Sequence, residues 1–330
     1  MKKHFIVVIS ALLVLALITG CSAAGGGASK EAKYGLFMSH MTNAFTIELS
    51  DAVKSKAQEL GVNLAVYDGG QDAAKQVSQV ETAVNEGIAA IVIEPVSVDG
   101  IIPAIETAKK AKIPVVTVNQ NISKPELVDC FVGVSHVEGG SVEMKAAMEM
   151  IGGKGKIALL LGPMGSDAQL GRSEGYKQVL ASYPDVEVVF EQTANWKTDE
   201  ALKLVENWLQ TGTDLVAIVA QNDGMALGAL KAVEDAKLSD KIKVFGLDAT
   251  PDALAAVKEG RLAATVSQST TEQGLKAMEA AVKLVKGEQV EKQIIVGHTL
   301  ITKDNVDPVS YTHLRAHETP EHLVCRLLLE

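Results

Sequence analysis

The feature that most restricts the fold of this chain is a repeated alternation of short apolar runs with segments of helical periodicity. The strand-like runs are YGLFM, VNLAVY, AAIVI, PVVTV, FVGV, KIALLL, VEVVF, LVAIV, KVFGL and AATVS. Strand followed by helix, repeated along a chain, is typical of parallel sheets, and continuous apolar runs indicate that helices cover both sheet faces. About ten strands exceed what one compact sheet usually holds, so we predict an α/β protein with more than one sheet.

Two stretches of the sequence repeat the same order of elements. Residues 90–118 and 217–247 each read as a strand, a polar turn, a helix and a second strand. This echo predicts two doubly wound parallel-sheet lobes. In open parallel sheets ligands bind beyond the carboxyl ends of the strands. The runs LVAIV and KVFGL lead to Asn222, Asp223 and Asp248, which therefore predict a binding cleft.

Composition narrows the class of partner. A chain of 330 residues with 47% hydrophobic and 4% aromatic residues is long enough for two packed domains. Its formal net charge of -10 argues against binding DNA or RNA, which requires clustered Lys and Arg. We expect no nucleic-acid partner.

The N-terminal residues have the pattern of a secretory signal. Lys2 and Lys3 precede an apolar run over residues 5–18, which ends just before Cys21. The run is shorter than the ~20 residues that a membrane-spanning helix needs. Because small residues directly before Cys21 resemble a bacterial lipobox, we predict a signal peptide over 1–20, lipidation at Cys21, and a flexible tether over 21–32. The alternative is ordinary cleavage within residues 22–29.

The remaining cysteines and histidines predict neither a disulfide framework nor a metal site in the body of the chain. Cys130 reads as a small apolar residue at the start of a strand. The tail, residues 309–330, breaks the pattern of the preceding chain. His313 and His317, with Cys325 nearby, have a spacing that permits metal binding. We favour a foreign or frame-shifted end of the gene sequence and exclude this tail from the functional argument.

Several separated segments resemble the sugar-binding proteins of ABC importers, in particular the ribose-, galactose- and inositol-binding branch of the type I periplasmic binding proteins. They are SHMTNAF, AAIVIEPVSVDG, IPVVTVNQ, LGPMGS before GRSEGY, AQNDGMALGALKA and VFGLDATPDALAAVKEGRLAATVSQ. The resemblance runs from about Lys33 to Asp307. It implies an N-terminal lobe of residues 33–135 plus 269–297 and a C-terminal lobe of residues 136–268 plus 298–308. A three-crossing hinge would join them near residues 134–136, 268 and 297.

The same resemblance implies a function and a set of partners. The protein is expected to be monomeric and to lie outside the cytoplasm, in the periplasm or on the outer face of the cell membrane. It would capture a monosaccharide, polyol or cyclitol by closing its cleft and would deliver that ligand to a membrane permease. No cofactor is expected.

A polyhydroxylated ring offers hydroxyls to polar side chains and C–H faces to aromatic rings, so its binder needs both kinds of group. The family pattern places these ligand-binding residues at Ser39, Asn43, Phe45, Glu94, Asn119, His136, Trp196, Asn222, Asp248 and Gln268. Phe45 and Trp196 would stack on opposite faces of the ring.

Five of these residues have a structural alternative. The alternative for Asn222 is a role as a helix cap only, and the alternative for Phe45 is core packing beneath the first helix. Glu94 reads equally as a solvated turn before a proline. Ser39 is suited to satisfy a backbone group at a strand end, and His136 to a structural role at the hinge.

Some positions depart from the ribose-binding pattern. Thr46 stands in place of a second aromatic residue, Asn119 and Gln120 in place of an acid and an arginine, Leu170 in place of a ligand arginine, and Leu247 in place of a phenylalanine. Losing both cationic donors removes strong charge-assisted contacts and disfavours ribose. Glu94 adds an acceptor and favours a cyclitol such as inositol, a polyol, or another pentose or hexose. Arg172 is expected to support the fold.

Other functions receive less support from the sequence. Asp223 and Asp248 offer an acid and base pair of the kind found in glycosidases, but no nucleophile with an oriented base accompanies them. The run GGKG at 152–155 follows a helix and precedes a strand, the reverse of a phosphate loop. A sugar-responsive repressor needs a DNA-binding headpiece at the N-terminus, where this chain has the pattern of a signal peptide. A receptor that presents sugar to a chemoreceptor or sensor kinase remains the alternative to an importer component.

Overall fold

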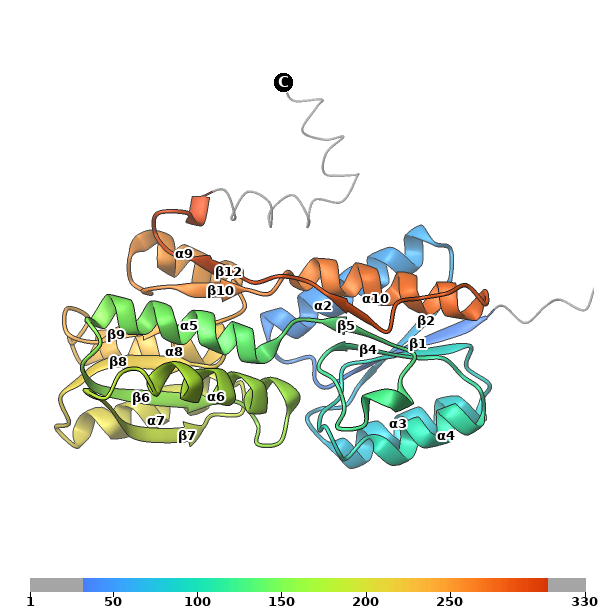
Figure 1. Cartoon of the computed structure of the whole chain (residues 1–330), viewed down its shortest axis with the longest axis horizontal. Helices are drawn as coiled ribbons and strands as arrows, with labels where there is room; N and C mark the ends of the chain where they lie inside the picture. The colour runs from blue at the N-terminus through green and yellow to red at the C-terminus, as the bar shows by residue number, and fades with distance from the viewer. Residues whose placement is uncertain (1–31, 308–330) are drawn as a thin grey trace, which may run out of the picture. The chain divides into compact units, whose positions relative to one another are not determined.

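A computed structural model describes residues 32–307, which form an α/β fold built on parallel sheets (Figure 1). The first sheet has six strands, all parallel, in the order β11-β5-β4-β3-β1-β2. Its strands are β1 (Lys33–Met38), β2 (Asn63–Asp68), β3 (Ala90–Ile93), β4 (Val115–Asn119), β5 (Cys130–Gly133) and β11 (Gln293–Ile295).

Helices cover both faces of this sheet. Helices α2 (Ala44–Glu59) and α10 (Thr270–Val285) pack together on one face, and α3 (Ala73–Asn85) and α4 (Ile102–Lys110) pack on the other (Figure 1). A short 3₁₀ helix, η1 (Pro125–Leu127), lies between β4 and β5. Leu49 and Met278 join Val92 in the core of the first face, and Ile105 joins Ile91 in the core of the second. Burial on both faces explains why the strands are continuously apolar.

The second sheet has four strands in the order β7-β6-β8-β9. Its strands are β6 (Gly155–Leu161), β7 (Val186–Thr193), β8 (Leu215–Ala220) and β9 (Lys243–Phe245). Beside it, β10 (Thr265–Ser267) pairs antiparallel with β12 (Thr299–Ile301), and isolated bridges connect the segment after β9 to β10. Helices α5 (His136–Ile151) and α6 (Asp167–Leu180) cover one face, while α7 (Thr198–Gln210), α8 (Asp223–Asp235) and α9 (Pro251–Glu259) complete the other.

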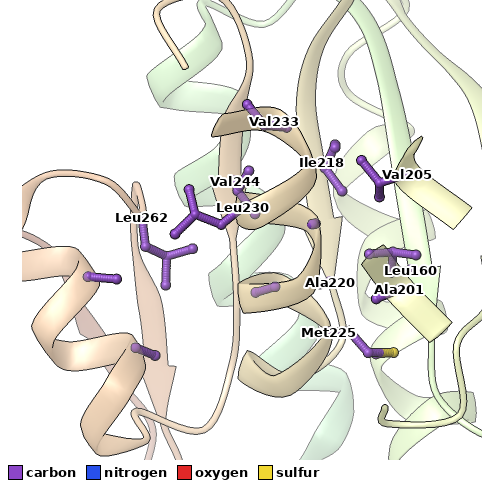
Figure 2. Close-up of a cluster of buried hydrophobic side chains, with 14 of the residues drawn as sticks. Leu160, Ala201, Val205, Ile218, Ala220, Met225, Leu230, Val233, Val244 and Leu262 are labelled. Atoms are coloured by element: carbon purple, nitrogen blue, oxygen red, sulfur yellow. The ribbon is translucent and has the colours of Figure 1, made fainter. Parts of the chain in front are cut away.

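Figure 2 shows the larger hydrophobic cluster of this second sheet. Leu160 and Ile218 extend from the strands, Val205 from α7, and Met225 and Leu230 from α8. All five side chains are buried, and burying each stabilises the fold by about 1.5–3 kcal/mol relative to exposure. The cluster therefore fixes the start of α8, where Asn222 and Asp223 lie.

Strand order confirms the predicted fold class. Both sheets change direction beside their first strand, at β1 and at β6, and the crevice beyond such a point is where open α/β sheets bind ligands. Each of the ten predicted runs contains a strand. Strands β11 and β12 were not predicted, because each is short and has exposed positions, so neither forms a continuous apolar run.

The chain passes between the two sheets three times. It does so between β5 and α5, between β10 and α10, and between β11 and β12. The precise lobe boundaries stay a prediction. The predicted signal peptide, Cys21, most of the tether and the tail at 309–330 lie outside the described residues. Within residues 32–307 no helix is long and apolar enough to cross a membrane.

Candidate ligand-binding site

A cavity of about 30 Å³ is lined by residues that follow strands of both sheets. Eight of the ten predicted residues line it, namely Asn43, Phe45, Glu94, Asn119, Trp196, Asn222, Asp248 and Gln268. Five further residues complete the wall: His40, Thr46, Gln120, Ala168 and Arg172. An outer groove of about 550 Å³ adjoins this cavity and shares Phe45 and Trp196 with it.

Glu94 forms the polar centre of the wall from the first sheet. It follows β3 and is buried, so it is not the solvated turn that its proline neighbour permitted. Ser39 Oγ donates a hydrogen bond to Glu94 Oε2 over 2.7 Å, and Asn119 Nδ2 donates to Glu94 Oε1 over 2.9 Å. Gln76 Nε2 donates to the Glu94 carbonyl over 2.9 Å. Ser39 is absent from the cavity lining and holds this carboxylate in place.

Asn119 takes its position through backbone strain and a histidine. Its φ is 60°, a left-handed conformation that costs a non-glycine residue free energy and often marks a functional site. His136 Nε2 lies 2.9 Å from the Asn119 carbonyl, which only accepts, so Nε2 carries the proton. Burial lowers the pKa of His136 well below its usual value. His136 is absent from the cavity lining, and its geometry is that of a positioning residue beneath Asn119.

Asp248, Gln268 and Arg172 form a connected polar wall from the second sheet. Gln268 Nε2 donates to Asp248 Oδ1 over 2.6 Å, and Gln268 Oε1 accepts from Arg172 Nη2 over 3.3 Å. Arg172 Nη2 also lies 3.9 Å from Asp248 Oδ1, and Nη1 donates to the Gln221 carbonyl. Burial raises the pKa of Asp248, while the Arg172 guanidinium acts in the opposite direction.

Two aromatic side chains line the same cavity. Phe45 lies on α2, where it packs into the core of the first sheet and also lines the cavity, and its stacking on a ligand stays a prediction. Trp196 has a φ of 63° and follows Asn195, whose φ is 54°. The Trp196 ring lies over the backbone of Gly162, and the Arg172 guanidinium carbon is 5.6 Å from its centroid, a cation–π contact.

Asn43 and Asn222 each cap a helix while lining the cavity. Asn43 Oδ1 accepts from Thr46 N over 2.9 Å at the start of α2, and Asn222 Oδ1 accepts from Met225 N over 2.9 Å at the start of α8. The capping bonds use the amide oxygens. Both residues therefore have amide N–H groups left to donate to a ligand.

Asp223 is directed away from the cavity. Its carboxylate accepts from Thr250 N over 2.8 Å and from Thr265 Oγ1 over 2.7 Å. Burial raises its pKa to about 6. These contacts hold the loop after β9, so an acid and base pair with Asp248 receives no support from the geometry. Within residues 32–307 no group of His, Cys, Asp and Glu is arranged to hold a metal ion.

Two kinds of lining residue were not predicted as ligand contacts. His40 and Gln120 directly follow predicted ligand positions at strand ends, so the strand-end signal points to them as well. Arg172 lies within α6, where it was expected only to support the fold. In the structure Arg172 contacts Gln221 and Gln268 and also lines the cavity. Leu170 is half-exposed and Leu247 is buried outside this lining.

Comparisons with known proteins show what this chain is similar to. A family model described as a periplasmic binding protein domain matches residues 34–289. The xylitol-binding protein of Mycolicibacterium smegmatis is 35% identical over 88% of this chain and 83% of its own length. The ribose import binding protein of Escherichia coli is 33% identical over 89% of this chain and 98% of its own.

A solved structure of similar sequence contains a ligand. It is an ABC transporter solute binding protein from Bacillus halodurans with bound myo-inositol, 33% identical to this chain, with a TM-score of 0.83. The match covers 86% of this chain and 99% of that one.

Proposed function

Because this chain belongs to the periplasmic binding protein family and the relatives named above bind sugars or polyols, we propose that it captures a cyclitol, polyol or monosaccharide for an ABC permease. Its relatives are solute-binding proteins and not enzymes, and the family places the protein outside the cytoplasm. Delivery to a permease is favoured over presentation to a chemoreceptor or sensor kinase, because two of the named relatives are a ribose import binding protein and an ABC transporter solute binding protein.

The observation that carries the proposal is the pairing of acceptors and donors on opposite walls of one buried cavity. Glu94 and Asn119 contribute from the first sheet, and Asn222 and Asp248 contribute from the second. Carboxylates accept hydrogen bonds from hydroxyls, and amide groups donate to hydroxyl oxygens. Trp196 supplies an aromatic face against which the C–H side of a ring packs.

We rank cyclitols and polyols above ribose. Thr46 and Gln120 line the cavity where the ribose-binding pattern has an aromatic residue and an arginine. Glu94 adds a buried acceptor suited to a ligand rich in hydroxyl donors. The relatives that bind xylitol and myo-inositol support this ranking.

Ligand capture would proceed by hinge closure, the established motion of periplasmic binding proteins. The cavity of about 30 Å³ is lined from both sheets, so closure of its two walls would bring both sets of side chains onto one ligand. Gln71 Nε2 donates to the Asn195 carbonyl over 3.1 Å, and Asn121 N donates to Asp167 Oδ2 over 2.8 Å. These bonds join the proposed lobes, 33–135 plus 269–297 and 136–268 plus 298–308, and would break on opening.

A ligand that contacts both walls binds completely only when the lobes close. Its differential affinity for the closed form therefore shifts the population of conformations toward closure. We propose in addition that Cys21 carries a lipid that holds the monomeric protein at the membrane.

Isothermal titration calorimetry with a panel of inositols, polyols, pentoses and hexoses tests this function. We expect binding to at least one inositol or polyol, and Trp196→Ala and Asp248→Ala should each weaken it at least tenfold while circular dichroism shows an intact fold. Tight ribose binding with no inositol or polyol signal would overturn the ligand ranking. Unchanged affinity in both variants would remove these residues from the site.

A further inference from the structure

Glu94 is a buried carboxylate without a cationic partner. Its side chain is 2% exposed. The groups that donate to its carboxylate are Ser39 Oγ, Ser39 N at 3.3 Å and Asn119 Nδ2, all of them neutral. Among residues 32–307 no Lys or Arg side chain forms an ion pair with it. Buried charges in proteins are usually paired, because neutral donors compensate only part of the lost hydration.

The opposite wall differs in this respect. Asp248 has Arg172 Nη2 at 3.9 Å, and Gln268 connects the two side chains. The cavity lining thus contains two carboxylates and one guanidinium. The uncompensated carboxylate is Glu94, on the side away from Arg172.

His40 is the remaining titratable side chain of the lining, and it does not supply the missing charge. Burial lowers the pKa of His40, the negative charge of Glu94 acting in the opposite direction. The imidazole is therefore neutral at pH 7. Its Nδ1 atom is already 2.8 Å from Thr42 Oγ1.

A second observation comes from Asn119. This residue is 3% exposed, and its Oδ1 atom has no hydrogen-bond partner. Because Asn119 Nδ2 bonds to Glu94, the free Oδ1 atom belongs to the same side-chain cluster. A single hydroxyl has one hydrogen to donate, whereas an ammonium group has three. Two neighbouring hydroxyls would also supply two hydrogens, but they would leave the charge of Glu94 uncompensated.

We propose that the preferred ligand is an amino sugar, aminopolyol or aminocyclitol, whose protonated amine binds Glu94 and Asn119 Oδ1. This inference rests on the proposed function and deepens it by naming the charge of the ligand. The hydroxyls of the same molecule would meet Asn222 and Asp248 on the other wall.

Matched pairs of ligands test the inference by calorimetry on the wild-type protein. Each pair differs by one amine in place of one hydroxyl, such as an inosamine with the corresponding inositol and D-glucosamine with D-glucose. We expect the amino member of at least one pair to bind tenfold or more tightly. Glu94→Gln keeps the shape of the side chain and removes its charge, and it should abolish this preference. Glu59→Gln, at an exposed ion pair with Lys56, is the matched control and should leave the preference unchanged.

A measurement on the wild-type protein covers the case in which Glu94→Gln fails to fold. Raising the pH through the pKa of the ligand's amine should weaken binding of the amino member and leave the neutral member unaffected. The neutral member of each pair controls for titration of the protein's own cavity groups, such as Asp248, whose pKa burial raises.

The outcomes separate this inference from the proposed function. Tight binding of the neutral members with no gain from the amine overturns the inference alone, as does an equal loss of affinity for both members in Glu94→Gln. If the protein binds no sugar, polyol or cyclitol of either kind, the proposed function is overturned and this inference with it.

Discussion

A methyl group added at Gly162 should disrupt the site without touching a ligand. Gly162 follows β6 and is absent from the cavity lining. An alanine Cβ at this position would lie 2.0 Å from Cη2 and 2.1 Å from Cζ2 of Trp196. The backbone of Gly162 is not left-handed, and the three atoms nearest to the added methyl all belong to the Trp196 indole. In Gly162→Ala the Trp196 ring must therefore move away from its place beside Arg172.

The size of the effect follows from overpacking. Forcing a methyl group into a filled space costs about 1–3 kcal/mol. If the indole can relax in the open form but not in the closed one, this cost falls on the bound state. The dissociation constant should then rise about 5- to 150-fold, since 1.4 kcal/mol corresponds to tenfold. The melting temperature should change little by comparison.

Calorimetry with the best ligand of the panel measures this change. Tryptophan fluorescence in a Trp208→Phe background reports Trp196 alone, because these are the two tryptophans of the chain and Trp208 is buried against Phe190. Gly100→Ala is the control, since its methyl would lie no closer than 3.1 Å to its nearest neighbours, which are Ala73 Cβ and the Ser97 side chain. Wild-type affinity in Gly162→Ala would refute the placement of Trp196 against the ligand.

Three further predictions concern stability and location. Burial raises the pKa of Glu143 to about 8 from its ordinary 4.5, so stability should fall as the pH rises from 4.5 to 8 and this carboxyl ionises. Glu143→Gln should flatten that dependence in urea titrations at pH 5 and 8, and an unchanged slope would contradict it. Gly175→Ala should destabilise the fold by about 1–3 kcal/mol in urea unfolding, because its Cβ would lie 2.3 Å from the Val137 carbonyl; a smaller loss would show that α5 and α6 can separate. Cys21→Ala should move the protein from the membrane to the soluble fraction, and continued membrane association would rule out this anchor.

Much of the fold was predictable because burial on both faces leaves a direct trace in the sequence. Runs such as KIALLL and LVAIV are typical of strands covered by helices on both sides, and they form β6 and β8. The strands β11 and β12 gave no such trace. Each is three residues long with exposed positions, so its pairing depends on tertiary contacts and not on its own composition.

The site was predictable where polar residues lie at or just after the carboxyl ends of strands. Glu94, Asn119 and Asn222 have that position, and all line the cavity. Arg172 does not, because it lies within a helix and reaches the cavity only through the packing of α6 against α5. That packing depends on Gly140, whose Cβ would lie 2.5 Å from the Arg172 carbonyl.

The hydrogen bonds that hold the site residues in place could not be predicted from the sequence. Nothing in the order of residues indicates that Ser39 would bond to Glu94, or that His136 would bond to the backbone of Asn119. The left-handed φ at Asn119 and Trp196 is equally a product of the assembled fold.

The three passages of the chain between sheets affect how the protein can be made. Helix α10 and strand β11, which complete the first sheet, come from residues 270–295, long after its other strands. Until they are synthesised, Val92 and Val116 lack the cover that Ala277 and Met278 provide. The emerging N-terminal half therefore cannot bury all of its apolar surface early. Completion of the first sheet is expected to come late in folding, after residues 270–295 have joined the strands made first.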